Sequence, residues 1–206
     1  MEVQRVAEGL WRWTGRHEEW RQQVGCVYLE APGAVVLIDP LVPREDEERF
    51  WSALDRDVER AGTPVHVLIT IYWHTRSARR LAERYGAPVW AHAKGERTVG
   101  RRAGDVSPFE PGDPLPGAVQ AVLARRSEVV YWLPQHRTLV TGDVILGDGD
   151  GGLRFCPESW TPTAGGHAAW RRNLRPLLDL PVERVLPSHG QPVLADGRAA
   201  LERLLA

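Results

Sequence analysis

The sequence predicts an α/β (α+β) fold, a four-layer αββα sandwich with two mixed β-sheets face to face and helices on the outer faces. Two apolar runs on either side of a turn in residues 23–38 indicate a β-hairpin. A strand–helix–strand passage over residues 65–92 is a βαβ unit, so part of one sheet is expected to be parallel. The second half begins again with strands and ends in helix, strand and helix, which indicates a second sheet with its own helices.

The first half is expected to alternate strands and helices. Strands are predicted at Gln23 to Leu29 and Ala34 to Ile38, around the turn signal "EAPG". Residues 44–61 are predicted to be a helix, because the segment starts acidic and its apolar residues recur every four positions, at Phe50, Leu54 and Val58. A short apolar strand, residues 65–70, comes next.

The βαβ unit continues from that strand. Ser77 to Tyr85 fits a helix that Gly86 closes in the left-handed position, and the strand "APVWAH" follows. Residues 94–117 are rich in Gly, Pro and Arg and are expected to be irregular.

The second half is predicted to hold three strands, residues 118–123, 128–133 and 138–141, with "LPQHR" as the turn between the last two. Residues 142–162 are expected to be loop-rich. A helix in "GGHAAWRRNLRPLLDL", a strand in "VERVLPSHG" and a closing helix in "DGRAALERLLA" complete the chain. Because no repeat, linker or low-complexity segment interrupts it, residues 1–206 are expected to form one domain.

Composition and charge exclude several classes of function. Of the 206 residues 43% are hydrophobic and 26% are charged, as in an ordinary soluble globular protein. The formal net charge of −1 gives no attraction for nucleic acid or an anionic membrane, so neither is expected as a partner. The N-terminus lacks the features of a signal peptide, and no apolar run approaches the roughly 20 residues of a membrane span.

The two cysteines, Cys26 and Cys156, form no CxxC pair, so a reduced, cytoplasmic setting is expected, with a disulfide between them left open. The expected partner is a small-molecule substrate or ligand, and a homo-oligomer is left open. The abundance of Arg, Ala, Gly and Pro is typical of a GC-rich bacterial genome.

Three short loops each follow an apolar strand and present a polar side chain. They contain His74 after "VLIT", Asp143 after "RTLV" and His189 after "ERVLP". Open α/β sheets gather their sites at the carboxyl ends of strands. Two imidazoles and one carboxylate suit Zn²⁺ or Fe²⁺, so these three residues are the predicted metal ligands.

Four motifs surround these loops: "VLIDP" with Asp39, "EVVYWLPQHRTLVTGD", "TGDV" with Asp143, and "LPSHG" with His189. In this order and spacing the chain resembles the metallo-β-lactamase superfamily over nearly its whole length. The resemblance implies the αββα fold. It also implies that Asp143 matches an aspartate that bridges two metals, and that His189 matches a ligand of the second metal.

The sequence departs from that family in its main motif, T-H-x-H-x-D-H followed by a helix. If the chain is aligned on Thr70 without a gap, all four ligand positions are lost. If it is aligned on the helix, His74 lies seven residues before Leu81, as the motif's last histidine does, and Trp73 replaces the metal-binding aspartate. The second alignment is preferred, because helix packing fixes the phase.

The family's next ligand is a histidine before the hairpin, where this chain has "VLARRSEVV" with Ala124 or Arg125 at that place. The resemblance therefore implies that the first metal site has lost its three histidines, whereas the second keeps His74, Asp143 and His189. One ion at most, zinc or iron, is expected, and a protein without metal is the alternative.

Other residues are candidates for contact with a substrate. The first hairpin of this fold leans over the cleft, so His17 or Glu18 could touch a substrate or supply a missing ligand. Arg125 either fills the vacant first site with positive charge and binds an anionic group, or forms a surface pair with Arg126. Asp39 is expected to orient the loops behind the site.

The tryptophans have two interpretations. Packing in the core is the favoured one, and an aromatic wall around the cleft is the alternative. Trp73 is the candidate that adjoins the predicted ligands. The other tryptophans in segments around the cleft are Trp11, Trp13, Trp20 and Trp160.

Each predicted ligand also has a structural interpretation. His74 could be a polar loop residue beside Trp73, Asp143 could cap backbone amides after its strand, and His189 could bond to a neighbouring loop. Two hypotheses for function follow. The first is a mononuclear metal-dependent hydrolase of an ester, thioester, lactone or phosphoester, for which the sequence assigns no catalytic base. The second is a degenerate, non-catalytic member that binds a small molecule or a protein partner without metal.

Overall fold

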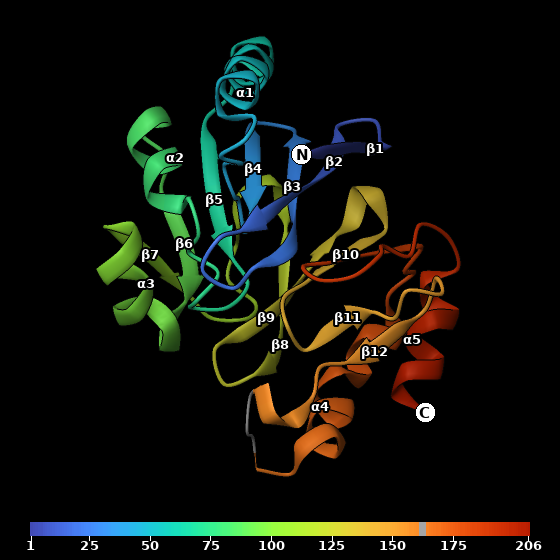
Figure 1. Cartoon of the computed structure of the whole chain (residues 1–206). Coiled ribbons are helices and arrows are strands. Elements are labelled where there is room, and N and C mark those ends of the chain that lie inside the picture. The colour runs from blue at the N-terminus through green and yellow to red at the C-terminus, as the bar shows by residue number, and fades with distance from the viewer. Residues whose placement is uncertain (161–163) are drawn as a thin grey trace.

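The computed structural model describes residues 1–160 and 164–206 and confirms the αββα sandwich (Figure 1). Within these ranges the first sheet has seven strands in chain order, antiparallel from β1 to β4 and parallel from β4 to β7. Its strands are β1 (Glu2–Ala7), β2 (Leu10–His17), β3 (Gln22–Ala31), β4 (Ala34–Ile38), β5 (Val65–Ile69), β6 (Val89–His92) and β7 (Val106–Phe109).

The second sheet, counted over the same described ranges, has four strands in the order β13-β10-β9-β8, of which only β13 and β10 are parallel. Its strands are β8 (Gln120–Arg125), β9 (Glu128–Leu133), β10 (Thr138–Thr141) and β13 (Arg184–Pro187). A small antiparallel pair lies beside it, β11 (Ile145–Gly147) with β12 (Leu153–Phe155). Both large sheets are therefore mixed, as the sequence predicts.

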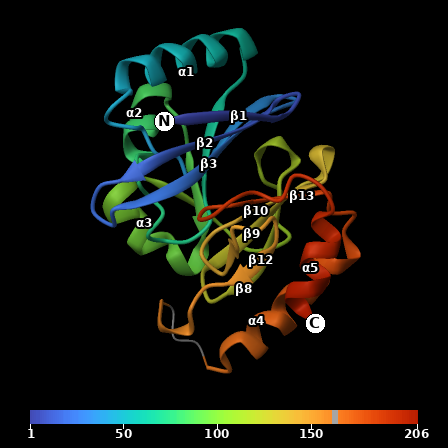
Figure 2. The same cartoon turned by 45° about the vertical axis from the view of Figure 1, so that its right-hand side comes forward.

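The helices cover the two outer faces. Figures 1 and 2 show the first three helices on one side of the sheets and the last two on the other. The first group is α1 (Glu47–Ala61), α2 (Ala78–Tyr85) and α3 (Glu96–Ala103), and the second is α4 (Gly166–Leu174) and α5 (Gly197–Leu205). Short 3-10 turns are η1 (Ala93–Gly95), η2 (Pro116–Ala118), η3 (Pro134–His136), η4 (Glu158–Trp160) and η5 (Arg175–Asp179).

Three apolar clusters fill the three interfaces between the four layers. In β4, Val35 and Leu37 belong to the cluster under α1 to α3, whereas Val36 and Ile38 belong to the cluster between the sheets. Alternate residues of a strand point to opposite faces, so a strand buried on both sides is apolar throughout. This explains why the central strands read as unbroken apolar runs.

Helix ends follow the sequence signals closely. Gly62 and Gly86 both have φ of 62°, a left-handed conformation that costs glycine little, and they end α1 and α2. The first helix begins at Glu47, later than the predicted residue 44, with Asp46 at its N-cap position. Two acidic residues, Glu47 and Glu48, then lie at the positive end of the helix.

One expectation is wrong: residues 94–117 are not irregular, because they contain α3 and β7. The helix buries only Val99 and Ala103, a pattern too short to indicate a helix from sequence, and such short helices depend on packing. The stretch 142–162 was expected to be loop-rich, yet it contains β11, β12 and η4. Its last two residues lie outside the described ranges.

The amino-terminal strands β1 and β2 also escaped prediction. β1 pairs with β2 and β2 pairs with β3, so the two strands extend the first sheet at its antiparallel edge, as Figure 2 shows. Cys26 belongs to the cluster under α1 to α3, and Cys156 to the cluster under α4 and α5. Among the described helices, none has the length and apolar character needed to cross a bilayer.

Candidate metal centre

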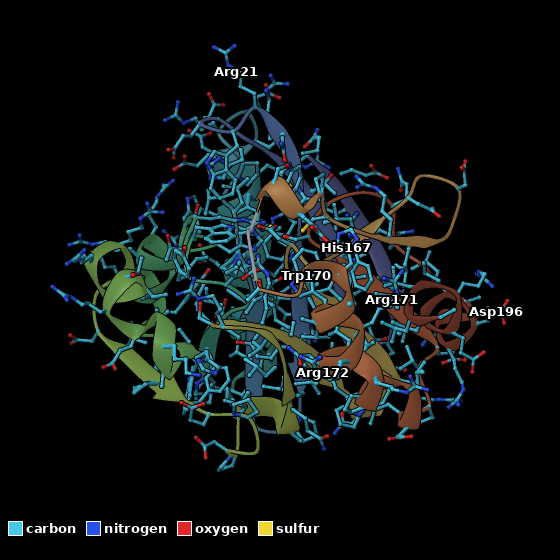
Figure 3. All side chains as sticks on the ribbon, turned by 90° about the horizontal axis from the view of Figure 1, so that it is seen from below. Arg21, His167, Trp170, Arg171, Arg172 and Asp196 are labelled. Carbon is cyan, nitrogen blue, oxygen red and sulfur yellow. The ribbon has the colours of Figure 1, made fainter. Side chains whose placement is uncertain are left out.

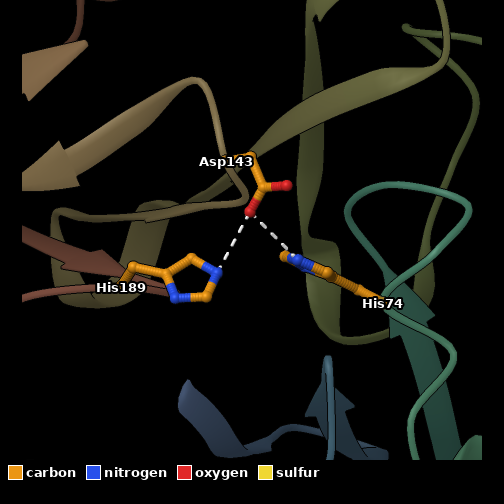
Figure 4. A group of neighbouring side chains, drawn as sticks. All are labelled: His74, Asp143 and His189. Atoms are coloured by element: carbon orange, nitrogen blue, oxygen red, sulfur yellow. Dashed lines mark ion pairs between the residues drawn. The ribbon is translucent and has the colours of Figure 1, made fainter. Parts of the chain in front are cut away.

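Three loops that are far apart in sequence meet at one edge of the sandwich. His74 follows β5, Asp143 follows β10, and His189 follows β13. The parallel pairing of β10 with β13 continues past the strand ends, because Ser188 N–H donates to the carbonyl of Thr141 at 3.0 Å. This pairing brings the second and third loops together, and the first sheet supplies His74 from the other side (Figure 4).

The carboxylate of Asp143 lies between the two imidazoles. Its Oδ1 atom is 3.1 Å from His74 Nε2 and 3.2 Å from His189 Nε2, as the dashed lines in Figure 4 mark. The three candidate ligand atoms all lie within 4.8 Å of one another, and all three residues are buried. The three side chains predicted as ligands therefore lie together in the structure.

The geometry of this cluster fits a metal ion. Among the described residues, neither His74 Nε2 nor Asp143 Oδ1 has a directional hydrogen bond, although both atoms are fully buried. Buried polar atoms without partners are costly. Ligands bound at about 2.0–2.2 Å around a tetrahedral zinc lie roughly 3.3–3.6 Å from each other, slightly more than the two distances between Asp143 and the histidines. Both atoms gain a partner if they bind one shared ion.

Asp39 lies behind His74 and contacts its ring. His74 Nδ1 is 2.8 Å from Asp39 Oδ2, and the backbone N–H of Thr70 donates to Asp39 Oδ1 at 2.8 Å. The hydroxyl of Thr70 also donates to Asp39. An ionised Asp39 makes Nδ1 the protonated nitrogen, which leaves the Nε2 lone pair directed toward Asp143 and a metal.

Asp143 has partners at its backbone N–H and at its second carboxylate oxygen, in addition to the two histidines. The indole N–H of Trp73 donates to its Oδ2 at 2.7 Å, the side away from the histidines. Its backbone N–H donates to Glu128 Oε1 at 2.6 Å, and the same oxygen accepts Val144 N–H at 2.7 Å. A Cβ at Gly142 would lie 2.8 Å from that oxygen, so this turn requires glycine.

Glu128 is in turn paired with Arg125, and both are buried. Arg125 Nε donates to Glu128 Oε2 at 2.7 Å. The guanidinium carbon lies 5.5 Å from the ring centre of Trp73 and 5.8 Å from that of Trp170, a residue of α4 labelled in Figure 3. Arg125 is thus an inner residue between two indoles, and it is not the surface partner of Arg126.

Arg76 ties the loops of the site together. Its Nη1 donates to the carbonyls of Gly25 at 2.9 Å and Asp39 at 2.7 Å, and its Nη2 donates to the hydroxyl of Ser188 at 2.6 Å. One side chain therefore connects β3, the end of β4 and the loop that carries His189. Arg76 does not reach the ligand cluster, which agrees with the helix-phased alignment of His74.

Charge and burial act in opposite directions on the site. Burial acts to lower the pKa of His74, but the charges of Asp143 and Asp39 outweigh it and raise that pKa to about 9. Burial acts to raise the pKa of Asp143, but His74 and His189 hold it well below its usual range. Burial raises the pKa of Glu128 to about 7, against the opposing charge of Arg125.

A cavity of about 430 Å³ opens over the cluster. It is lined by Trp20, Gln22, Trp73, Asp143, Trp160 and His189. His17 stacks on Trp20 with ring centres 4.5 Å apart, and Trp20 lies 6.2 Å from the ring of His74. His17 therefore adjoins this cavity through Trp20.

The other tryptophans divide between wall and core. Trp20, Trp73 and Trp160 line the cavity, whereas Trp13 packs against Phe50 under α1 and Trp11 contacts Tyr28. Sequence reasoning missed Glu128 and Arg76. A charged residue at the start of the apolar strand "EVVYWL" was the available signal for Glu128.

The family model of the metallo-beta-lactamase superfamily matches residues 74–189, more than half of the chain. The matched segment begins at His74 and ends at His189. The chain belongs to the metallo-beta-lactamase superfamily. No curated protein sequence matches it.

Solved structures of metallo-beta-lactamases share its fold. A metallo-beta-lactamase from Pontibacter korlensis is 19% identical, with 99% of this chain and 98% of that chain covered and a TM-score of 0.69. A beta-lactamase domain protein from Burkholderia ambifaria is 18% identical, with 98% and 75% covered and a TM-score of 0.69. A metallo-beta-lactamase family protein from Thermus thermophilus is 18% identical, with 97% and 79% covered and a TM-score of 0.64.

In this metallo-beta-lactamase fold, the pH dependence of the metal-free form tests the electrostatics of the centre. Without metal, protonated His74 stabilises the folded chain fully below its ordinary pKa of 6.5, and this stability is lost as pH rises through about 9. The melting temperature in chelator is therefore expected to fall between pH 6.5 and 9. Added zinc reverses the trend, because it requires a neutral imidazole. Differential scanning fluorimetry measures both.

Variants assign that trend to one residue. His74→Gln is expected to flatten the decline, whereas His136→Gln, at a half-buried histidine whose pKa burial lowers, is expected to retain it. A melting temperature that rises over this pH range in chelator contradicts the assigned ion pairs.

Proposed function

We propose that the chain is a mononuclear metal-dependent hydrolase that cleaves an ester, thioester, lactone or phosphoester. The observation that carries this proposal is the convergence of His74 Nε2, His189 Nε2 and Asp143 Oδ1. Two of these buried atoms lack a directional hydrogen bond within the described part of the chain. Membership of a superfamily of metal-dependent hydrolases supports the same conclusion.

His74, Asp143 and His189 would hold a Zn²⁺ or Fe²⁺ ion, which would supply a Lewis acid for a carbonyl or phosphoryl oxygen and would lower the pKa of water. The protein supplies orientation. Asp39 holds the ring of His74, and Trp73 and Glu128 hold Asp143. The cavity wall excludes water from one face of a bound substrate.

Trp73, His17 and Arg125 are the proposed substrate contacts. Trp73 lines the cavity directly. His17 acts through its stacking partner Trp20, and Arg125 lies behind the indole of Trp73. One domain over residues 1–206, a cytoplasmic location and a small-molecule substrate remain part of this proposal.

A second function is favoured by one contact. The indole N–H of Trp73 donates to Asp143 Oδ2, so a neutral donor partly satisfies a carboxylate that would otherwise bind metal through both oxygens. A member that binds a small molecule or protein partner without metal would use the same cavity.

Metal content separates the two functions. Protein loaded with zinc or iron and then desalted is expected to hold about one ion per chain by elemental analysis. It is expected to hydrolyse at least one substrate in a panel of activated esters, thioesters, lactones and phosphoesters, with turnover lost in chelator and restored by metal. Absence of stoichiometric metal would overturn the hydrolase and favour the second function. Metal without turnover would retain the metal centre and overturn the catalysis.

A further inference from the structure

A second cavity of about 490 Å³ adjoins the metal centre on the far side of Trp73. It is lined by Ile71, Tyr72, Trp73, Lys94, Arg125, Arg126, Ser127 and Trp160. Trp73 and Trp160 line both cavities. A ligand that crosses these two indoles therefore reaches the candidate metal ligands and the second cavity together.

The lining of this cavity is positively charged. Three of its residues, Lys94, Arg125 and Arg126, are cationic, and among the described residues that line it none is acidic. Glu128 is fully buried and pairs with Arg125. Lys94 and Arg126 retain their charge uncompensated by an ion pair in the described part of the chain, so an anion is the favoured occupant.

Arg125 has donors left for a ligand. Its Nε makes the aligned bond to Glu128 Oε2, whereas Nη2 lies 2.6 Å from the same oxygen without a directional hydrogen bond. Within the described residues Nη2 finds no other acceptor, although Arg125 is only 6% exposed. A guanidinium carries five N–H donors, so the pairing of Arg125 with one oxygen of Glu128 leaves donors on this cavity wall that an oxyanion can use.

The backbone at Arg126 supports the same conclusion. Arg125 pairs with Glu128 across the β8–β9 hairpin, which leaves Arg126 and Ser127 as a two-residue loop. Arg126 has φ of 39°, in the left-handed region that a hairpin usually fills with glycine or asparagine. A cation at this position costs backbone energy that a glycine would not, and its side chain lines the cavity.

We propose that this cavity, the cationic pocket, binds a carboxylate or phosphate group carried by the substrate whose scissile bond lies over His74, Asp143 and His189. The group lies against Lys94 and Arg126, with Arg125 on the same wall, and the indoles of Trp73 and Trp160 contact the part of the substrate between. The role in catalysis rests on the proposed hydrolase function, whereas anion binding does not. The cationic pocket would therefore favour esters, thioesters or lactones that carry an acidic group.

Direct binding tests the pocket without turnover. In chelator, glutarate and inorganic phosphate are titrated separately into the protein, and calorimetry and total tryptophan fluorescence report binding. Arg125 is unsuitable for substitution because it is buried against Glu128. The test variant is therefore Lys94→Gln with Arg126→Gln, two exposed residues. It is expected to weaken binding at least about tenfold, as the loss of charged hydrogen bonds implies.

The matched control is Arg97→Gln with Arg101→Gln, which removes the same charge from exposed positions of α3 outside the lining. It is expected to bind both anions like the parent protein. Equal loss in the two double variants, or no binding of either anion by the parent, overturns the pocket. Whichever of glutarate and phosphate binds with the higher affinity identifies the anionic group as a carboxylate or a phosphate.

A substrate pair then links the pocket to the metal centre. The mono-4-nitrophenyl ester of glutaric acid and 4-nitrophenyl pentanoate differ in a terminal carboxylate. The zinc-loaded parent is expected to favour the acidic ester in kcat/KM by at least about tenfold, and the Lys94→Gln, Arg126→Gln variant is expected to lose this preference with unchanged metal content. If the parent protein hydrolyses both esters at equal kcat/KM, the proposed anion binding in the cationic pocket is overturned and the hydrolase function is retained. If the protein binds anions but neither holds metal nor hydrolyses an ester, the hydrolase function is overturned and the pocket is retained.

Discussion

An Asp143→Asn variant is expected to lose stoichiometric metal binding and, with it, metal-dependent hydrolysis. Asp143 is the only anionic member of the cluster, and its Oδ1 lies between the two histidine nitrogens. An amide has nearly the same shape but carries no charge, so a divalent ion loses its charge-compensating ligand. Metal affinity is expected to fall at least about 100-fold, as measured by competition with a chromophoric chelator.

The substitution is chosen to keep the fold. The backbone N–H of residue 143 still donates to Glu128, and the asparagine carbonyl can still accept the indole N–H of Trp73. The matched control is Asp148→Asn, in the exposed loop after β11, where the side chain accepts only backbone N–H groups. Retention of one ion per chain in Asp143→Asn would contradict the assigned centre. Loss of metal in both variants would point to an effect on the whole protein.

The second large effect is expected at Glu128. Truncation to alanine removes the acceptor of the backbone N–H groups of Asp143 and Val144 and leaves Arg125 buried without its carboxylate. Breaking a buried pair by removing one partner costs about 3–5 kcal/mol. The free energy of unfolding by urea, measured on metal-free protein, is expected to fall by that amount.

Two further variants separate charge from hydrogen bonding. Glu128→Gln keeps an oxygen for the two backbone donors but not the charge, so the double variant with Arg125→Met is expected to recover part of the stability. Glu202→Ala breaks an exposed pair with Arg198 in α5 and is expected to cost less than about 1 kcal/mol. A Glu128→Ala variant as stable as Glu202→Ala contradicts a structural role for the buried pair.

Much of the fold could be predicted because its strands are buried on both faces. The apolar runs at β4, β9 and β10 have the predicted bounds, and turn residues delimit them. Two of the elements that escaped prediction, β1 and α3, are only partly buried. β1 is exposed or half-buried along its length, and α3 buries only Val99 and Ala103. Such segments are ordered by the neighbours they pack on, which a local pattern does not contain.

The site divides in the same way. His74, Asp143 and His189 each follow an apolar strand, and strand ends on one edge of a sandwich meet, so their meeting could be predicted. Glu128 and Arg76 act through contacts that link loops far apart in the chain. Arg76 joins Gly25, Asp39 and Ser188 in space, and no spacing in sequence indicates this.

Trp73 gives the clearest example of what packing adds. In the sequence, the resemblance to the family motif places this indole at the position of an aspartate. In the folded chain its N–H donates to Asp143 Oδ2, and its ring separates the candidate metal centre from a pocket of three cations. The order of residues sets the strands, the turns and the three candidate ligands, because these follow from local periodicity and strand ends. The orientation of those ligands and the charge of the neighbouring pocket depend on side chains from both sheets, which only the packed sandwich brings together.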